Sequence, residues 1–255
     1  MPTNRAPADY PGCPATVTEA VASGAVLRDP RWGLWDVLIG MIGAVVLAFA
    51  VGFALFATDA PLVAQILIGT TAPWLMLAGW PLLITRLRGN GPRMDLGLRL
   101  SWSDTAWGLG GGLVALMLAG VAAVITQIVF PDLTSAAADA AAELEAEGGR
   151  PSLVIFAIIV MIGAPMVEEL FFRGLFFASL RKRGVGSVLT ILLTAVVFAG
   201  FHLEPTRFLV LLPSGLVLGW VRWRTGSTGA SMVSHGLVNA PGALALLVGL
   251  PDVSP

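Results

Sequence analysis

The sequence predicts an all-α protein: a polytopic transmembrane helical bundle of seven or eight helices. Composition is the first indication, because 56% of the 255 residues are hydrophobic and only 12% are charged, whereas soluble domains carry about 25% charge. The second is that the apolar residues are gathered in runs close to the ~20 residues that a membrane span needs. We therefore expect lipid to surround most of the protein surface.

Seven apolar segments are candidate spans. They cover residues 35–57, 61–85, 105–130, 151–180, 187–202, 208–221 and 228–250. The first is longer than the ~7–15 residue apolar region of a signal peptide, so we expect it to be a retained helix. Pro165 lies inside the fourth, where a proline kinks or splits a helix, and a split there would give an eighth span.

The charges of the connecting segments predict an orientation. Basic residues precede the first span and follow the second, fourth and sixth, whereas acidic residues dominate the other connections. Since positive residues mark the cytoplasmic side, we expect a cytoplasmic N-terminus. Arginine outnumbers lysine fourteen to one and alanine is abundant, which suggests a bacterial plasma membrane. The net charge of −1 gives no reason to expect a nucleic-acid partner.

Residues 1–31 form a predicted polar N-terminal tail with a short surface helix near 16–27, and residues 32–255 form the transmembrane domain. Within that domain, 32–130 are N-terminal spans and 151–250 carry the motifs described below. For the Ala- and Glu-rich stretch 135–147 we favour a solvated acidic loop over an exposed helix or a dock for a basic substrate. The sequence predicts neither the oligomeric state nor roles for 1–31 and 131–150.

Three small features have structural interpretations. A single cysteine, Cys13, excludes an internal disulfide and a cysteine-rich zinc site. The pairs Gly108/Gly112 and Gly215/Gly219 have the spacing of small residues at close helix–helix contacts.

Six polar residues lie inside apolar sequence in the C-terminal half. They are Glu168, Glu169, Arg173, His202, His235 and Asn239. A charge at mid-bilayer costs about 2.5–3.5 kcal/mol on insertion scales, so such residues usually face a cavity or a partner. Counted at 1.5 Å per residue, they reach comparable depths on three helices. We expect Glu168, His202, His235 and Asn239 to converge on one water-accessible cavity that opens toward the cytoplasmic half of the bilayer.

Helical spacing predicts which of these side chains share a face. Glu169 and Arg173 are i,i+4 and can pair, whereas Glu168 is rotated by about 100° and is free to point elsewhere. His235 and Asn239 are also i,i+4 and would present two hydrogen-bonding groups to one point. Structural alternatives stay open, because a buried Glu–Arg pair, an intramembrane histidine or an asparagine can simply tie helices together.

The chemistry of the set favours hydrolysis. No H-E-x-x-H zinc motif and no G-x-S-x-G serine elbow is present. What remains is a carboxylate base, two imidazoles and an amide donor, which suit water activation and stabilisation of a tetrahedral oxyanion. Phe198, one turn before His202, would form a wall of the same pocket.

Three motifs make the set recognisable: E-E-x-x-x-R at 168–173, F-x-x-x-H at 198–202 and H-x-x-x-N at 235–239. In this order, on successive spans, they resemble the CAAX protease and bacteriocin-processing family of intramembrane endopeptidases, also called the abortive-infection family. The resemblance covers about residues 151–241.

The resemblance implies proteolysis within the membrane, on a peptide or membrane-protein substrate, and it implies a role for each motif residue. Glu168 would act as general base on a water held with His202, while His235 and Asn239 would donate to the oxyanion. Glu169 and Arg173 would orient Glu168 and balance its charge.

The family is commonly labelled a metalloprotease, yet the same residues suffice for a metal-free mechanism, which we favour. A zinc ion is the alternative; its candidate ligands would be Glu168, Glu169, His202 and His235. Two other functions are alternatives of a different class: a non-catalytic peptide-binding or immunity scaffold, and a proton-coupled transporter that uses Glu168 and the histidines as a relay.

Overall fold

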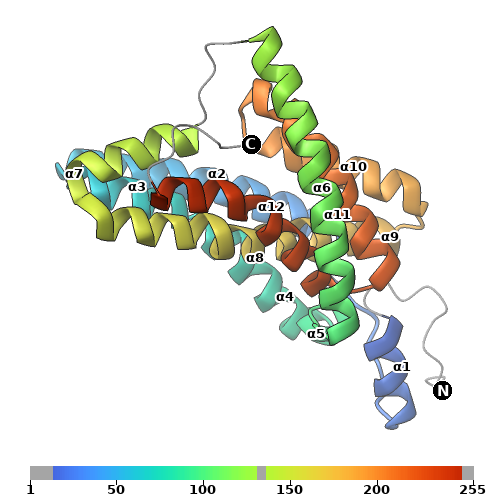
Figure 1. Cartoon of the computed structure of the whole chain (residues 1–255). Helices are drawn as coiled ribbons and strands as arrows, with labels where there is room; N and C mark the ends of the chain where they lie inside the picture. Colours follow the sequence, from blue (N-terminus) through green and yellow to red (C-terminus); the bar gives the residue numbers. More distant parts are fainter. Residues whose placement is uncertain (1–13, 131–135, 249–255) are drawn as a thin grey trace.

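In the computed structural model, the described residues are 14–130 and 136–248, and every regular element in these ranges is helical (Figure 1). The elements are α1 (Pro14–Ala22), α2 (Leu34–Ala57), α3 (Leu62–Thr71), the π-helix η1 (Leu75–Gly79), α4 (Trp80–Arg88), α5 (Pro92–Asp95), α6 (Trp102–Val129), α7 (Ala136–Ile158), the π-helix η2 (Ile159–Gly163), α8 (Ala164–Glu169), the π-helix η3 (Leu170–Phe176), α9 (Phe177–Lys182), α10 (Ser187–Phe201), α11 (Pro205–Thr225) and α12 (Thr228–Val248). The predicted helical bundle is confirmed. Cys13 lies outside the described residues.

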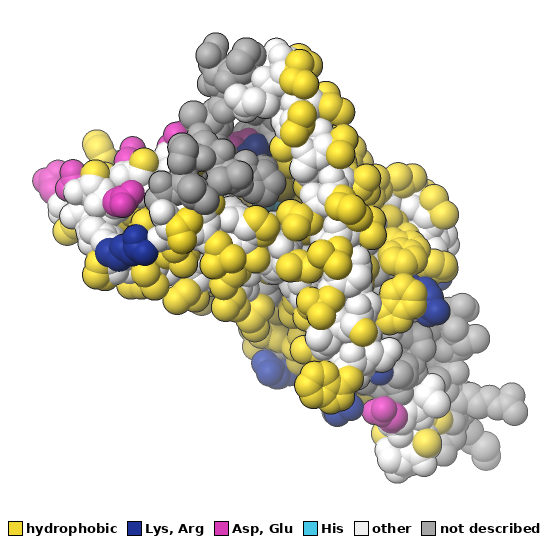
Figure 2. Space-filling view, in the orientation of Figure 1, with side chains coloured by type: hydrophobic (Ala, Val, Ile, Leu, Met, Phe, Trp, Pro, Cys, Tyr) yellow, Lys and Arg dark blue, Asp and Glu magenta, His cyan; other side chains and the backbone are white. Residues whose placement is uncertain are grey.

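All seven predicted spans coincide with helices. Five helical stretches of the described chain are long and apolar enough to cross a membrane: Leu34–Ala57, Leu62–Arg88, Trp102–Val129, Ala136–Lys182 and Thr228–Val248. The apolar helix α10 has only 15 residues, and α11 is not among the five. Hydrophobic side chains cover much of the visible face (Figure 2), as expected of a surface in contact with lipid. The protein is a polytopic membrane protein, and its number of spans stays a prediction.

The fourth span does not split at Pro165. The π-helix η2 directly precedes α8, in which Pro165 is the second residue. A π turn changes the local hydrogen-bonding register, so it accommodates the N–H that proline lacks. The chain stays helical from α8 through the second π segment, η3, to α9.

The loop predicted for residues 135–147 is wrong. The helix α7 begins at Ala136, and the helical conformation breaks later, at Gly149, which has φ 63° and lies two residues before Pro151. Figure 1 shows α7 doubling back on itself. Ala141 and Leu144, three residues apart, are buried against apolar side chains of α3. Alanine and leucine favour helix, and this buried stripe stabilises it, while the glutamates face outward.

The basic connections gather at one end of the molecule, as their alternation predicts. Arg31 N–H donates to the Arg88 carbonyl, Lys182 donates to the Trp32 carbonyl, and Ser227 donates to the Arg99 carbonyl. Acidic side chains stand out at the opposite end, where α7 turns (Figure 2). Which compartment the basic end faces stays a prediction.

Glycines set the positions of the helices that carry the site. A Cβ at Gly108 of α6 would lie 2.7 Å from the Ala230 carbonyl of α12, and one at Gly112 would lie 2.9 Å from the Ser234 carbonyl. A Cβ at Gly215 of α11 would lie 3.3 Å from the Phe198 ring of α10. The predicted close packing at these positions is confirmed, and it brings α10, α11 and α12 together around η3.

Candidate active site

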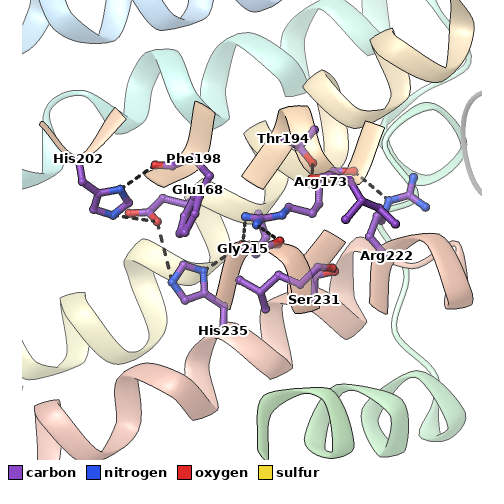
Figure 3. A network of polar contacts seen from close by, with 12 residues as sticks. Glu168, Arg173, Thr194, Phe198, His202, Gly215, Arg222, Ser231 and His235 are labelled. Atoms are coloured by element: carbon purple, nitrogen blue, oxygen red, sulfur yellow. Dashed lines mark hydrogen bonds and ion pairs between the residues drawn. The ribbon is translucent and has the colours of Figure 1, made fainter. Parts of the chain in front are cut away.

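Side chains from four helical elements meet beside Phe198 (Figure 3). Glu168 and Glu169 end α8, Arg173 lies in η3, His202 caps the C-terminus of α10, and His235 lies in α12. The predicted convergence of both histidines with the two glutamates is therefore found in the structure.

The inner part of the cluster is a fully buried ion pair. Arg173 and Glu169 have no exposed surface, and Nη1 of Arg173 donates to Glu169 Oε1 over 2.7 Å. The Nη2 group of Arg173 donates to the Gly215 carbonyl over 2.9 Å. An unpaired buried charge would cost several kcal/mol, so each charge requires the other. The pair predicted from i,i+4 spacing is confirmed.

His235 extends this pair toward the second glutamate. Its Nδ1 lies 3.0 Å from Glu169 Oε1. Since Glu169 is paired with Arg173 as a carboxylate, it accepts, and Nδ1 of His235 carries the donated hydrogen. The other ring nitrogen, Nε2, then points toward Glu168, whose Oε2 is 3.9 Å away.

Glu168 lies between the two imidazoles, as Figure 3 shows. Its Oε2 is 3.9 Å from Nε2 of His202 and 3.9 Å from Nε2 of His235. The Glu168 side chain is 20% exposed, whereas Glu169 is 0% exposed. The predicted rotation between the adjacent glutamates thus separates a buried carboxylate from one within reach of water.

The tautomer of His202 follows from its backbone contact. Nδ1 lies 2.9 Å from the Phe198 carbonyl, and because a carbonyl only accepts, Nδ1 is the donor. In the neutral ring Nε2 then carries a lone pair. Two acceptors, His202 Nε2 and Glu168 Oε2, consequently face each other across 3.9 Å.

Phe198 holds the cluster together from one side. Its ring meets the rings of His202 and His235 edge-on, at centroid distances of 5.0 and 5.5 Å. The guanidinium of Arg173 lies over the same ring at 4.5 Å. The ring forms a wall of the site, as its place one turn before His202 predicts.

Asn239 makes its described hydrogen bond away from the glutamates. Its Nδ2 donates to the Val160 carbonyl of η2 over 2.9 Å, whereas His235 contacts Glu169 and Glu168. The expectation that His235 and Asn239 point to one place is therefore not met by these contacts. An amide nitrogen carries two hydrogens, so a second one is available.

Two positioning groups were missed at the sequence level. Arg222 was assigned to a basic connection, but it is 2% exposed, and its Nε donates to the Arg173 carbonyl over 2.9 Å. Arg222 and Arg224 are two residues apart on one helix, so they cannot share a face. This spacing was the indication in the sequence that the two arginines have different surroundings. The Gly215 carbonyl, a partner of Arg173, has no signal in side-chain chemistry.

The prediction of one cavity at these residues stays untested. Two pockets of the described structure lie elsewhere. One, of about 800 Å³, is an apolar groove between α6 and α11 that includes Trp107 and Trp220. The other, of about 220 Å³, lies at the start of α2.

The arrangement does not fit a zinc ion as it is placed. Within the described residues, no three or more His, Cys, Asp or Glu side chains are grouped to hold a metal. Tetrahedral zinc with bonds of ~2.1 Å separates its ligand atoms by about 3.4 Å, less than the 3.9 Å from Glu168 to either imidazole. Glu169 Oε1 is also committed to Arg173. Metal dependence itself is a question for chelation experiments.

Comparison with known sequences bears on this site. Residues 150–241 match the sequence model of a family described as Type II CAAX prenyl endopeptidase Rce1-like. No curated protein and no solved structure matches the chain. The matched segment contains all three motifs. The resemblance that these motifs predict is thereby confirmed: over residues 150–241 the chain is similar to the Rce1-like CAAX endopeptidases.

Proposed function

We propose that the protein is an intramembrane endopeptidase in which Glu168 and His202 activate the water that attacks a peptide carbonyl. The observation that carries the proposal is the facing pair of acceptors, Glu168 Oε2 and His202 Nε2, 3.9 Å apart. Two acceptors cannot bond each other, but one water can donate a hydrogen to each.

The distance suits such a water. With hydrogen bonds of ~2.8 Å to both acceptors, the 3.9 Å separation gives an angle of about 90° at the water oxygen, close to the angle between its O–H bonds. Both hydrogens are then held by the protein, and the oxygen lone pairs point away, toward an incoming carbonyl carbon. Glu168 takes one proton as the C–O bond forms, and it returns that proton to the leaving nitrogen as the C–N bond breaks.

His235 is placed to donate a hydrogen bond to the oxyanion that forms when water attacks the peptide carbonyl. Its ring lies between two carboxylates, Glu169 at 3.0 Å and Glu168 at 3.9 Å. Since Nδ1 donates to Glu169, donation from Nε2 requires the protonated ring. The second amide hydrogen of Asn239 is the other proposed donor.

The proposed substrate is a peptide leader or a membrane-protein segment that enters the bilayer. The proposal includes a bacterial plasma membrane, a cytoplasmic N-terminus and chemistry without a metal. The proposal is favoured over a peptide-binding scaffold because a carboxylate and two imidazoles meet at one point, and binding alone would not need this set.

Substrate identification tests the function. Mass spectrometry of protein termini would compare membranes from cells that express the wild type, Glu168→Gln, or the control Glu145→Gln. Glu145 lies on the exposed face of α7, so its variant also loses one carboxylate. New termini in the wild type and the control, but not in Glu168→Gln, support the proposal. Identical termini in all three would reject it.

A further inference from the structure

A second site lies at the basic end of the molecule, away from the glutamates. A pocket of about 220 Å³ occurs between the start of α2 and the end of α9, and Arg31, Ser179, Lys182 and Arg183 line it. From its charge, its size and its place in the membrane, we propose that this pocket binds the phosphate of an anionic phospholipid headgroup.

The first argument is an unsatisfied hydroxyl. Ser179 lines the pocket and is 0% exposed, and its Oγ has no hydrogen-bond partner within the described residues. Leaving a buried hydroxyl unpaired costs about 1–3 kcal/mol. A phosphate oxygen in the pocket would accept its hydrogen.

The second argument is an excess of positive charge among the residues that line the pocket. The side chains of Arg31 and Arg183 are exposed, and neither has a hydrogen bond or ion pair with the described residues. Lys182 donates to the carbonyls of Pro30 and Trp32, which leaves the third of its three hydrogens available.

The one acidic side chain of the pocket is already engaged. Asp36 pairs with Arg88 through Oδ1 and accepts from the Gly33 N–H through Oδ2. The pocket therefore presents cationic groups to an anion. It also includes Gly33 and Leu34, where α2 begins, and the N-terminus of a 24-residue helix adds favourable potential for a negative group.

The third argument is position. Trp35 also lines the pocket, and its side chain is 74% exposed at the start of a membrane span. Exposed tryptophans at span ends mark the level of the lipid headgroups. A phosphate held here would belong to a lipid whose acyl chains run beside α2, and for this reason we assign the site to a lipid rather than to a soluble phosphate.

The experiment measures lipid binding to the purified full-length protein. Detergent-solubilised protein is titrated with phosphatidylglycerol, phosphatidylcholine or inorganic phosphate, and bound lipid is followed by native mass spectrometry and by the thermal unfolding midpoint. We expect phosphatidylglycerol to bind at least about tenfold more tightly than phosphatidylcholine, since charge-assisted hydrogen bonds need the net negative headgroup. Equal binding of both lipids would overturn the proposal. Equally tight inorganic phosphate would overturn the lipid assignment.

Variants locate the binding. Arg31→Gln with Arg183→Gln should weaken phosphatidylglycerol binding about tenfold or more, while Arg86→Gln, an exposed arginine at the same end but outside the pocket, should change it less than about twofold. Ser179→Ala should weaken lipid binding yet raise the unfolding midpoint of the lipid-free protein, because it removes an unpaired hydroxyl. An equal loss in Arg86→Gln, or unchanged binding in Ser179→Ala, would refute the site.

Discussion

Replacing Glu168 by glutamine tests its proposed role as general base, because the change removes the base and keeps the size of the side chain. The amide keeps the length of the side chain and its place near both imidazoles, but it cannot take a proton. The amide oxygen can still accept a hydrogen from the attacking water, but no group at this position can remove the proton. General base catalysis contributes about 10²–10⁴ in rate. We therefore expect cleavage to fall by a factor in the upper part of that range, or about 4–5.5 kcal/mol in barrier.

The assay is steady-state cleavage of a quenched peptide reporter by protein in nanodiscs, normalised to folded protein. Glu168 is 20% exposed, and its contacts with the histidines are 3.9 Å, so the free energy of unfolding should change by only about 0.5 kcal/mol. The matched variant Glu145→Gln should retain full activity. If Glu168→Gln kept more than about a tenth of wild-type cleavage, the loss would be only ~1.4 kcal/mol, and the general-base role would be refuted.

Three further predictions concern the ion pair, the helix packing and the metal. Arg173→Met should lower the free energy of unfolding by about 3–5 kcal/mol, because it leaves the Glu169 carboxylate buried and unpaired; chemical denaturation measures this, and a loss below about 1 kcal/mol would contradict it. Gly108→Ala should destabilise the protein, since its Cβ would lie 2.7 Å from the Ala230 carbonyl. Gly110→Ala meets nothing within 4 Å and should be neutral or stabilising by up to ~1 kcal/mol; equal thermal shifts would contradict the packing. Purified protein should stay active after strong chelation, and a loss of cleavage that zinc restores but magnesium does not would replace the metal-free mechanism.

Periodicity and chemistry predicted much of this structure. The cost of charge in lipid singled out the polar residues, and i,i+4 spacing predicted the Glu169–Arg173 pair. Small-residue spacing predicted close helix packing at Gly108, and the structure shows that the partner is α12. Each of these signals lies within a single helix, so it can be interpreted without knowing which helices are its neighbours.

The features that the sequence did not predict depend on contacts with neighbouring helices. Residues 136–148 contain enough charge to suggest a loop, and only the apolar face of α3 shows why Leu144 favours a helix. The π turns that flank α8 follow from how Pro165 is accommodated. The direction of Asn239 depends on the Val160 carbonyl of η2, a backbone group that has no side-chain signature.

A buried ion pair often adds little net stability, because the free energy lost when both charges leave water offsets their attraction. A carboxylate and a guanidinium without exposed surface are often no more stable than an apolar pair of similar volume. The pair does, however, fix an acceptor 3.0 Å from Nδ1 of His235. That contact holds the ring so that Nε2 faces Glu168. In the proposed mechanism, Glu169 and Arg173 would act through His235 as positioning residues, while Glu168, one residue away and rotated toward water, would take part in proton transfer. The adjacent glutamates have different surroundings because a step of one residue rotates a helical side chain by about 100°.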